Sequence, residues 1–308
     1  MDPTDLDLKF QIPMQVKEGD VEVDVDAAVG AKVNMGIAMV GAPVVVGVGA
    51  VVVAADNSNL KNVIAVGSGK GGVGKSTVAV NLALALHQEG SKVGLLDADI
   101  YGPSIPIMMG LQGQKPKFND TGKIIPLEAH GIKTMSIGFI ADDNQAIIWR
   151  GPMIHKILDE FLSKVEWGDL DYLIVDLPPG TGDAQLSLSQ LIPLTGAVVV
   201  TTPQEVALVD VKRAVEMFRK VKIPLLGVVE NMDSDIFGSG GGEKAASLWQ
   251  VPFLGAIPLV ADIRKSGDSG TPIVVSDSTS VVSKTFREVA HNLSRIIPES
   301  NSFKINKS

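Results

Sequence analysis

Cysteine is absent from all 308 residues of the sequence. This absence excludes disulfide bonds, CxxC redox chemistry and any metal site built from thiolates. A block of basic residues is also missing, and the formal net charge is −8 at pH 7. Binding to nucleic acid through a broad positive face is therefore not expected. Because 45% of the residues are hydrophobic and 20% are charged, the composition predicts a well-packed soluble core.

The sequence does not begin like a secretory signal, because Met1 to Asp5 is acidic where a signal would be basic. The run 33–55 is uncharged and long enough to span a bilayer. Its apolar residues are mainly valine and alanine, interrupted by glycines and Pro43, and no Trp or Tyr lies at its ends as an anchor. Valine triplets broken by glycine are typical of short strands. A membrane segment is thus not favoured, and we expect a cytoplasmic protein.

The chain divides at a polar break, Asp56-Asn57-Ser58-Asn59. Residues 1–59 form an N-terminal appendage that we expect to be β-rich or partly mobile, since 21–26 alternates valine with acidic residues. Such a short piece would be marginally stable alone. Residues 60–300 form the main domain, and 301–308 form a short tail.

The main domain alternates strand-like and helical segments. Continuous apolar runs, which are typical of strands buried on both faces, occur at 63–67, 92–96, 172–176, 197–202, 225–230 and 253–257. Helical patterns occur at 75–89, 152–165, 184–192, 205–220 and 279–295. This alternation predicts an α/β fold, a mostly parallel sheet with helices on both faces. Ligands of such sheets bind beyond the carboxyl ends of the strands.

A glycine-rich loop follows the first strand of this domain and precedes a helix. It satisfies the pattern GxxxxGK[ST] in its expected context and predicts a phosphate-binding P-loop. Glycines let backbone amides curl around phosphate oxygens, and the helix N-terminus adds partial positive charge. Lys75 is expected to contact the β- and γ-phosphates, and the Ser76 hydroxyl to hold Mg²⁺. The predicted nucleotide-binding residues of the loop are Gly69, Gly71, Gly72, Val73, Gly74, Lys75, Ser76 and Thr77.

Acidic residues end two of the other strands. Asp97 and Asp99 follow the strand at 92–96, where a pair of carboxylates can position Mg²⁺ or orient a water molecule. Asp176 closes the apolar run at 172–176, the Walker B pattern that binds Mg²⁺ through water. The Pro-Pro-Gly-Thr-Gly sequence that continues to Asp183 is typical of a switch that senses the γ-phosphate. We therefore expect Ser76, Asp97 and Asp176 to form the metal site.

The second lysine of the loop, Lys70, resembles the deviant Walker A ATPases, which include MinD, ParA, the nitrogenase iron protein, ArsA and the Mrp/ApbC group. The resemblance implies a homodimer with ATP sandwiched between the subunits, in which Lys70 reaches the partner's nucleotide. It also implies that Lys70, Lys75 and Asp99 are catalytic, with Asp99 handling the attacking water. An asparagine in this class lies against adenine, and Asn231 matches that position, although asparagine also suits a turn.

Longer strings resemble the Mrp/ApbC family of iron–sulfur cluster carriers over residues 62–297. The matching segments are Asp97-Ala98-Asp99-Ile100-Tyr101-Gly102-Pro103-Ser104, Trp149-Arg150-Gly151-Pro152-Met153, Trp167-Gly168-Asp169-Leu170-Asp171-Tyr172, Asp176-Leu177-Pro178-Pro179-Gly180-Thr181-Gly182-Asp183, Glu230-Asn231-Met232, Ile236-Phe237-Gly238-Ser239-Gly240-Gly241-Gly242-Glu243 and Leu254-Gly255-Ala256-Ile257-Pro258-Leu259. The carriers have a CxxC between the Asn-Met and Phe-Gly-Ser-Gly segments, and two subunits bridge a cluster through it. Here only Asp233-Ser234-Asp235 joins these segments, so no thiolate is available for a cluster.

Three functions remain open, in this order of preference. The first is a carrier: a homodimeric, Mg-dependent ATPase that acts in iron–sulfur protein assembly with assembly or client proteins as partners, any cluster being held by unusual or partner-supplied ligands. The second is a regulatory or scaffold ATPase that binds partner proteins and carries no cluster. The third is a MinD-like membrane switch, which the short and weakly basic tail 301–308 does not favour. The helix at 279–295 has an apolar face that we expect to dock on the domain.

Overall fold

The computed structural model describes residues 22–23, 33–34, 60–99, 102–140, 151–182 and 194–297, without the side chains at 22–23, 33–34, 151–155 and 206–208. Contacts divide the chain into two units, Met1–Val52 and Val53–Ser308. In the first unit, strand β1 (Glu22–Val23) pairs antiparallel with β2 (Val33–Asn34). These strands fall within the alternating stretch 21–26 and at the start of the uncharged run 33–55. The rest of that run lies outside the described residues.

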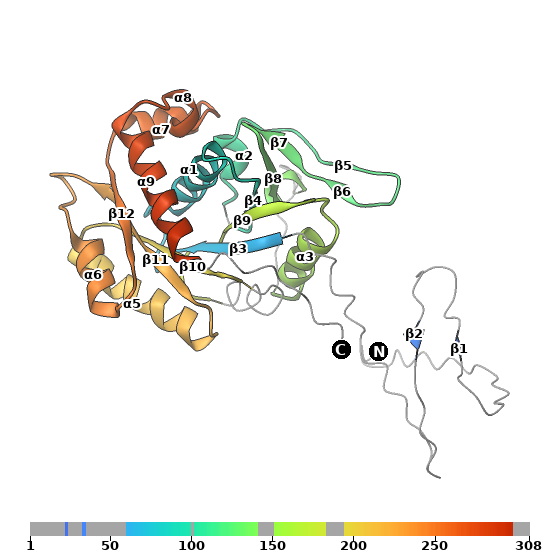
Figure 1. Cartoon of the computed structure of the whole chain (residues 1–308), viewed down its shortest axis with the longest axis horizontal. Coiled ribbons are helices and arrows are strands. Elements are labelled where there is room, and N and C mark those ends of the chain that lie inside the picture. Colours follow the sequence, from blue (N-terminus) through green and yellow to red (C-terminus); the bar gives the residue numbers. More distant parts are fainter. Residues whose placement is uncertain are drawn as a thin grey trace, which may run out of the picture. The chain divides into compact units, whose positions relative to one another are not determined.

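The described part of the second unit is built on an eight-stranded sheet of order β12-β11-β10-β3-β9-β4-β8-β7 (Figure 1). Its strands are β3 (Leu60–Gly67), β4 (Val93–Asp97), β7 (Leu127–Ala129), β8 (Ile132–Ser136), β9 (Leu170–Asp176), β10 (Gly196–Thr201), β11 (Leu225–Asp233) and β12 (Phe253–Pro258). Neighbouring strands run parallel, except that β7 is antiparallel to β8. The predicted α/β fold with a mostly parallel sheet is confirmed.

Helices pack on both faces of this sheet. Helices α1 and α9 contact each other and the sheet on one side, whereas α5 and α6 contact each other and β10 and β11 on the other (Figure 1). The helices are α1 (Lys75–Gln88), α2 (Ile105–Met108), α3 (Gly151–Ser163), α5 (Glu205–Lys220), α6 (Gly241–Trp249), α7 (Ala261–Asp268), α8 (Ile273–Ser276) and α9 (Val281–Ile296). The helix predicted over 184–192 lies outside the described residues.

The core explains why these segments are so apolar. Every residue of β4 and β10 is buried, and in α1 the whole stretch 78–86 is buried because that helix is covered by β4, β9 and α9. Helix α9 is one-sided, and its predicted apolar face docks on the domain through Val282, Phe286, Val289, Ala290 and Leu293. Full burial of one such large side chain contributes about 2–3 kcal/mol.

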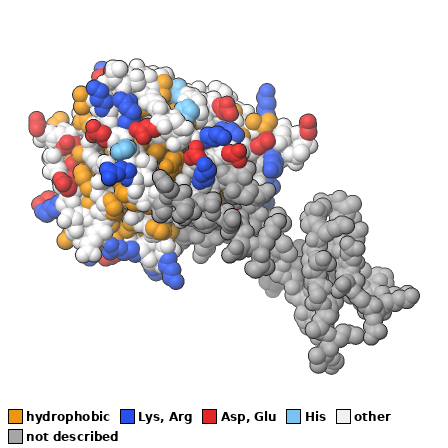
Figure 2. Space-filling model, in the orientation of Figure 1, with side chains coloured by type: hydrophobic (Ala, Val, Ile, Leu, Met, Phe, Trp, Pro, Cys, Tyr) orange, Lys and Arg blue, Asp and Glu red, His pale blue; other side chains and the backbone are white. Residues whose placement is uncertain are grey.

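Smaller elements surround this framework. A hairpin of β5 (Lys117–Phe118) and β6 (Ile124–Ile125) extends beside α3, and a 3-10 turn covers Ile137–Phe139 (Figure 1). Lysine and arginine side chains are interspersed with acidic ones on the described surface in Figure 2. Among the described residues, helices of sufficient length and apolarity to cross a membrane are not found.

Strand register brings the predicted site residues to one edge of the sheet. Asp97, at the end of β4, is directly paired with Asp176, at the end of β9. Asp176 is in turn paired with Val66 of β3, one residue before the strand gives way to the glycine-rich loop. Parallel strands share a carboxyl edge, so the loop and both acidic residues must converge there.

Candidate functional site

A cavity of about 370 Å³ lies over the glycine-rich loop. Its lining residues are Ser68, Lys70, Gly71, Gly72, Gly74, Lys75, Ser76, Thr77, Asp99, Ser104, Ile107, Met108, Pro179 and Asp268. Helix α1 begins at Lys75, so its first residues form part of this wall. The orphan amides of a helix N-terminus and its partial positive charge favour an anion there. The cavity is thus suited to phosphate groups.

The turn into α1 depends on glycine at position 74. Gly74 has a φ of 79°, in the left-handed region, and a Cβ atom there would lie 2.2 Å from Nδ2 of Asn231. The same Asn231 amide donates a 2.8 Å hydrogen bond to the carbonyl of Val73. Asn231 therefore fixes the shape of the loop from the end of β11. Its expected contact with adenine stays a prediction.

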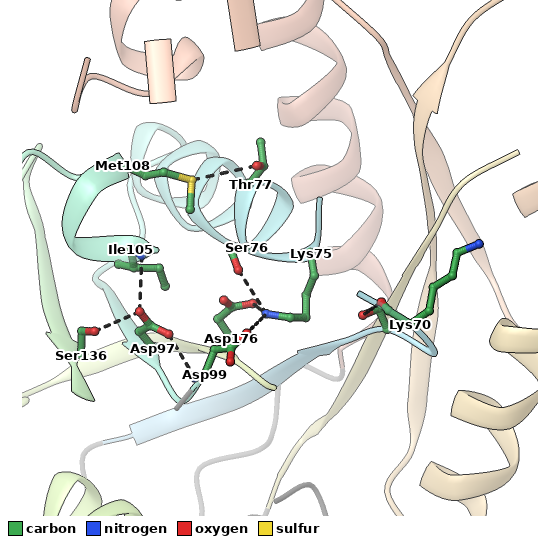
Figure 3. Close-up of polar contacts among 11 residues, drawn as sticks. Lys70, Lys75, Ser76, Thr77, Asp97, Asp99, Ile105, Met108, Ser136 and Asp176 are labelled. Atoms are coloured by element: carbon green, nitrogen blue, oxygen red, sulfur yellow. Dashed lines mark hydrogen bonds and ion pairs between the residues drawn. The ribbon is translucent and has the colours of Figure 1, made fainter. Parts of the chain in front are cut away.

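Lys75 is almost completely buried and is surrounded by acceptors (Figure 3). Its Nζ lies 2.6 Å from Oδ1 of Asp176, 3.1 Å from the Ser76 hydroxyl and 3.7 Å from Oδ2 of Asp99. Two carboxylates thus hold the ammonium at the floor of the cavity. Lys75 comes from α1, Asp176 from the end of β9 and Asp99 from the segment after β4, as the sequence predicts.

Asp176 has the environment expected of an indirect metal ligand. It is fully buried, and burial raises the pKa of this carboxyl above its ordinary value, against the opposing effect of Lys75. Its second oxygen, Oδ2, is buried without a hydrogen-bond partner. Such an orphaned carboxylate oxygen is costly unless a donor or cation reaches it. Together with the Ser76 hydroxyl in the cavity wall, this atom fits a site for hydrated Mg²⁺.

Asp97 occupies a different position from Asp99. Its oxygens accept hydrogen bonds from the Asp99 amide (3.1 Å), the Ser136 hydroxyl (2.9 Å) and the Ile105 amide (3.4 Å). It is fully buried and is not part of the cavity wall, whereas Asp99 lines the cavity. Burial, followed by the neighbouring carboxylate of Asp176, raises the pKa of Asp97 to about 8. Asp97 therefore holds the backbone on either side of the Asp99 segment.

A three-ligand metal cage is not what this geometry provides. Among the described residues, no group of three His, Cys, Asp or Glu side chains could hold a metal ion. P-loop proteins do not need one, because Mg²⁺ there binds a Ser or Thr hydroxyl, phosphate oxygens and water. The set Ser76, Asp97 and Asp176 thus remains a prediction, with Asp97 the member placed farthest from such a role.

Lys70 lines the cavity, but its ammonium is directed away from Lys75 (Figure 3). Its Nζ lies 3.5 Å from Oδ2 of Asp210 in α5, and Asp210 also lies 3.6 Å from Arg213. The Lys70 side chain is 34% exposed, so it is accessible to a second molecule. Within one chain, therefore, Lys70 does not approach Lys75 and its partners.

The segment where the resemblance places a CxxC forms a closed turn. Strand β11 continues to Asp233, and Ser234 and Gly238 then pair through both of their backbone hydrogen bonds, at 3.1 and 2.8 Å. Directly before it, the buried Glu230 accepts hydrogen bonds from the Gly240 amide (2.9 Å) and the Gly242 amide. The glycine-rich segment 238–242, which leads into α6, is thereby fixed.

Sequence reasoning placed the loop and the acidic residues correctly at one edge but missed other parts of the wall. Ile107 and Met108 of α2 and Asp268 of α7 line the cavity and carry no motif. Ser136 supports Asp97 through strand pairing, a contact that only the register of β4 and β8 creates. A local signal for Asp268 was available in Gly270, because a glycine shortly after a helix marks its end, and Asp268 is the last residue of α7.

The fold and the loop together define a P-loop nucleoside triphosphatase. Within that class, the ParA family model described as "NUBPL iron-transfer P-loop NTPase" matches residues 59–294. The chain belongs to this family.

Curated relatives carry a consistent description. The iron-sulfur cluster carrier protein of Pseudomonas fragi is 51% identical over 244 residues, which are 76% of this chain and 85% of the relative. The protein with the same description from Aquifex aeolicus is 53% identical over 249 residues, 77% of this chain and 68% of the relative. That from Escherichia coli K12 is 49% identical over 264 residues, 80% of this chain and 72% of the relative.

Solved structures show the same architecture. A nucleotide-binding protein from Archaeoglobus fulgidus in complex with ADP is 36% identical, has a TM-score of 0.64, and is matched over 80% of this chain and 95% of its own. The cell division ATPase MinD of Pyrococcus furiosus is 24% identical with a TM-score of 0.62, over 77% of this chain and 99% of its own. The MinD likeness shows the shared fold.

Proposed function

We propose that this protein is a Mg-dependent ATPase that works as a cytoplasmic homodimer in iron–sulfur protein assembly. The observation that carries the proposal is the buried lysine of the P-loop, Lys75, held between Asp176 and Asp99 at the floor of a cavity of about 370 Å³. The ADP complex of the 36% identical nucleotide-binding protein from Archaeoglobus fulgidus supports nucleotide binding. The descriptions of the curated relatives support the assembly role.

Each residue has a role that follows from its position. The loop amides and the start of α1 hold the phosphates, and Lys75 leaves its carboxylate partners to neutralise the β- and γ-phosphate oxygens. Asp99, in the cavity wall, orients the water whose oxygen attacks the γ-phosphorus as the bond to the bridging oxygen of ADP breaks. Mg²⁺, when bound, would be held by the Ser76 hydroxyl and by Asp176, and it would neutralise phosphate charge.

The dimer is part of the proposal because the second loop lysine is not used within one chain. Lys70 is directed toward Asp210 rather than toward the Lys75 cluster. A lysine supplied by a partner subunit would stabilise negative charge that develops on the transferring phosphoryl group. Turnover should therefore depend on protein concentration, and Lys70→Ala should lose hydrolysis while ADP binding is kept.

The catalytic assignment is tested by steady-state ATP hydrolysis. Lys75→Ala and Asp99→Asn should each abolish turnover, with Lys75→Ala also weakening ADP binding because it removes a phosphate contact. Lys265→Ala is a matched control, since this lysine pairs with Asp262 on the surface of α7. Wild-type turnover by Asp99→Asn would show that another group orients the water.

A second function is favoured by the composition itself. The chain has no cysteine, and the turn at 234–238 closes on itself where relatives of the carrier type would need ligands. A nucleotide-driven regulatory or scaffold ATPase that binds partner proteins and carries no cluster would need none. Such a protein could still act in iron–sulfur assembly through its partners.

Anaerobic reconstitution with iron and sulfide separates the two. Bound iron and visible absorption are measured per dimer, next to ATPase activity of the same sample. Stoichiometric and stable cluster would support the carrier function with ligands other than thiolates. Absence of bound iron with intact ATPase activity would establish the partner switch.

A further inference from the structure

The wall of the nucleotide cavity contains a carboxylate that the proposed chemistry does not use. Asp268, the last residue of α7, lines the cavity together with Thr77 of α1 and with Ile107 and Met108 of α2. Its Oδ2 lies 2.7 Å from Nη1 of Arg264, one helical turn earlier. The side chain is otherwise exposed to the cavity and solvent, at 64%.

The position of Asp268 is fixed by an unusually close backbone contact. Directly after α7, Gly270 packs against Gly110, and a Cβ atom on Gly270 would lie 2.6 Å from the Cα atom of Gly110. Both glycines have left-handed φ values, 73° and 68°. The His130 ring lies 2.9 Å from the carbonyl of Gly270 and secures the turn from the other side. The end of α7 is thus held firmly against the end of α2.

The neighbouring contacts tie the same region to the P-loop helix. A Cβ atom on Gly267 would be in ordinary contact, at 3.7 Å, with Cγ of Met108. The sulfur of Met108 in turn lies 4.0 Å from the hydroxyl of Thr77. Asp268 therefore lies on the side of the cavity where α1 continues past the phosphate loop, rather than beside the Lys75 cluster.

Charge decides which part of a nucleotide can face Asp268. A carboxylate next to phosphate oxygens would repel them, since like charges in a cavity are costly. It must therefore face a neutral group that donates hydrogen bonds, and the ribose of a nucleotide has two adjacent hydroxyl donors. A carboxylate accepts up to about four hydrogen bonds, so Arg264 leaves capacity for both. The same pairing of an acidic residue with ribose hydroxyls is used in dinucleotide-binding folds.

We propose that Asp268 binds the ribose hydroxyls of the nucleotide and makes the site selective for ribonucleotides over deoxyribonucleotides. Arg264 is its positioning residue, since it orients the carboxylate and reduces its net charge. This inference rests on the proposed nucleotide-binding function. It adds an element that recognises the ribose, supplied by α7, to a site whose other residues are expected to act on the phosphates, the metal and the base.

The test compares binding of ADP and 2′,3′-dideoxy-ADP by isothermal titration calorimetry. ADP is chosen because its binding does not require hydrolysis or a second subunit. Calorimetry needs no label on the ligand, so the ribose stays unmodified. The wild-type protein should bind ADP about tenfold or more tightly than the dideoxy compound, as expected for hydrogen bonds to a charged group. Asp268→Ala should bind both ligands with the weaker affinity.

The matched control is Asp262→Ala, which removes a carboxylate from the first turn of the same helix, where it pairs with Lys265 at 3.2 Å. This variant should keep the wild-type preference for ADP. Arg264→Ala should reduce the preference without changing the affinity for 2′,3′-dideoxy-ADP. Thermal unfolding of each variant confirms that it is folded.

Two outcomes would overturn the inference. Equal affinity of the wild-type protein for both ligands would show that the ribose hydroxyls are not recognised. A full ribose preference in Asp268→Ala would assign recognition to another residue. Failure of the wild-type protein to bind either ligand would be a different result, because it would remove the nucleotide-binding function on which the inference depends.

Discussion

Replacing Asp210 by alanine should strengthen ATP-dependent dimerisation. In the single chain, Lys70 pairs with Asp210 at 3.5 Å. A Lys70 that reaches the partner's nucleotide must first leave this pair. The pair therefore stabilises the separate subunit, and its loss should favour the dimer.

The expected size follows from exposure and distance. Two unit charges 3.5 Å apart attract by about 5 kcal/mol at an effective dielectric constant of about 20. Pairs near solvent contribute far less in measurements, about 0.2–1 kcal/mol, and Lys70 is 34% exposed. A symmetric dimer releases two such pairs, so the gain is about 0.5–2 kcal/mol. That corresponds to a roughly 2- to 30-fold tighter dimer.

Sedimentation velocity in the presence of Mg²⁺ and a non-hydrolysable ATP analogue measures the dimer dissociation constant. Glu216→Ala is the control, because Glu216 pairs with Lys212 on the exposed side of the same helix. This variant should dimerise like the wild type. A dissociation constant for Asp210→Ala equal to or weaker than that of the wild type would refute the reasoning, since the pair would then not compete with the dimer.

Three further predictions concern the loop and its supports. Gly74→Ala should destabilise the fold by about 1–2 kcal/mol and weaken ADP binding, because alanine is strained at a φ of 79°; wild-type values in thermal unfolding and calorimetry would contradict this. Asn231→Ala leaves the Val73 carbonyl without its donor and should cost about 1–3 kcal/mol in denaturant unfolding, with an unchanged midpoint as the opposing result. The pKa of Asp97 is raised to about 8, so the free energy of unfolding of the nucleotide-free protein should fall as pH rises from about 4 to about 8. Asp97→Asn removes this titration. Its stability relative to the wild type should therefore increase by up to about 1.4 kcal/mol per pH unit over that range. A difference in melting temperature that is constant over this range would show Asp97 to be ionised when folded.

The framework of the fold was predictable because its signals are local. Continuous apolar runs such as 172–176 marked buried parallel strands, and the loop between β3 and α1 carried a motif with its own backbone requirements. The face of α9 followed from helical periodicity. In each case the residues that determine the element lie within the element.

The parts that sequence reasoning missed depend on contacts between distant segments. Strands β7 and β8 are short, and β8 is specified by its pairing with β4. Asp268 lies in the cavity wall, and the end of its helix is held there where Gly270 meets Gly110, a contact between residues 160 positions apart by their numbering. Asn231 was expected against adenine, but its bond to Val73 shows a structural task that no motif encodes.

The end of β11 connects the candidate nucleotide site with the closed turn at 234–238. Asn231 holds the P-loop, Met232 follows in a left-handed conformation with a φ of 65°, and Glu230 holds the glycine-rich segment before α6. A left-handed, non-glycine residue inside a strand costs about 1–3 kcal/mol and persists only where its surroundings fix it. Here those surroundings are the P-loop on one side and the turn at 234–238 on the other. One strand end thus connects the P-loop with the turn at 234–238, where Ile236 is 82% exposed.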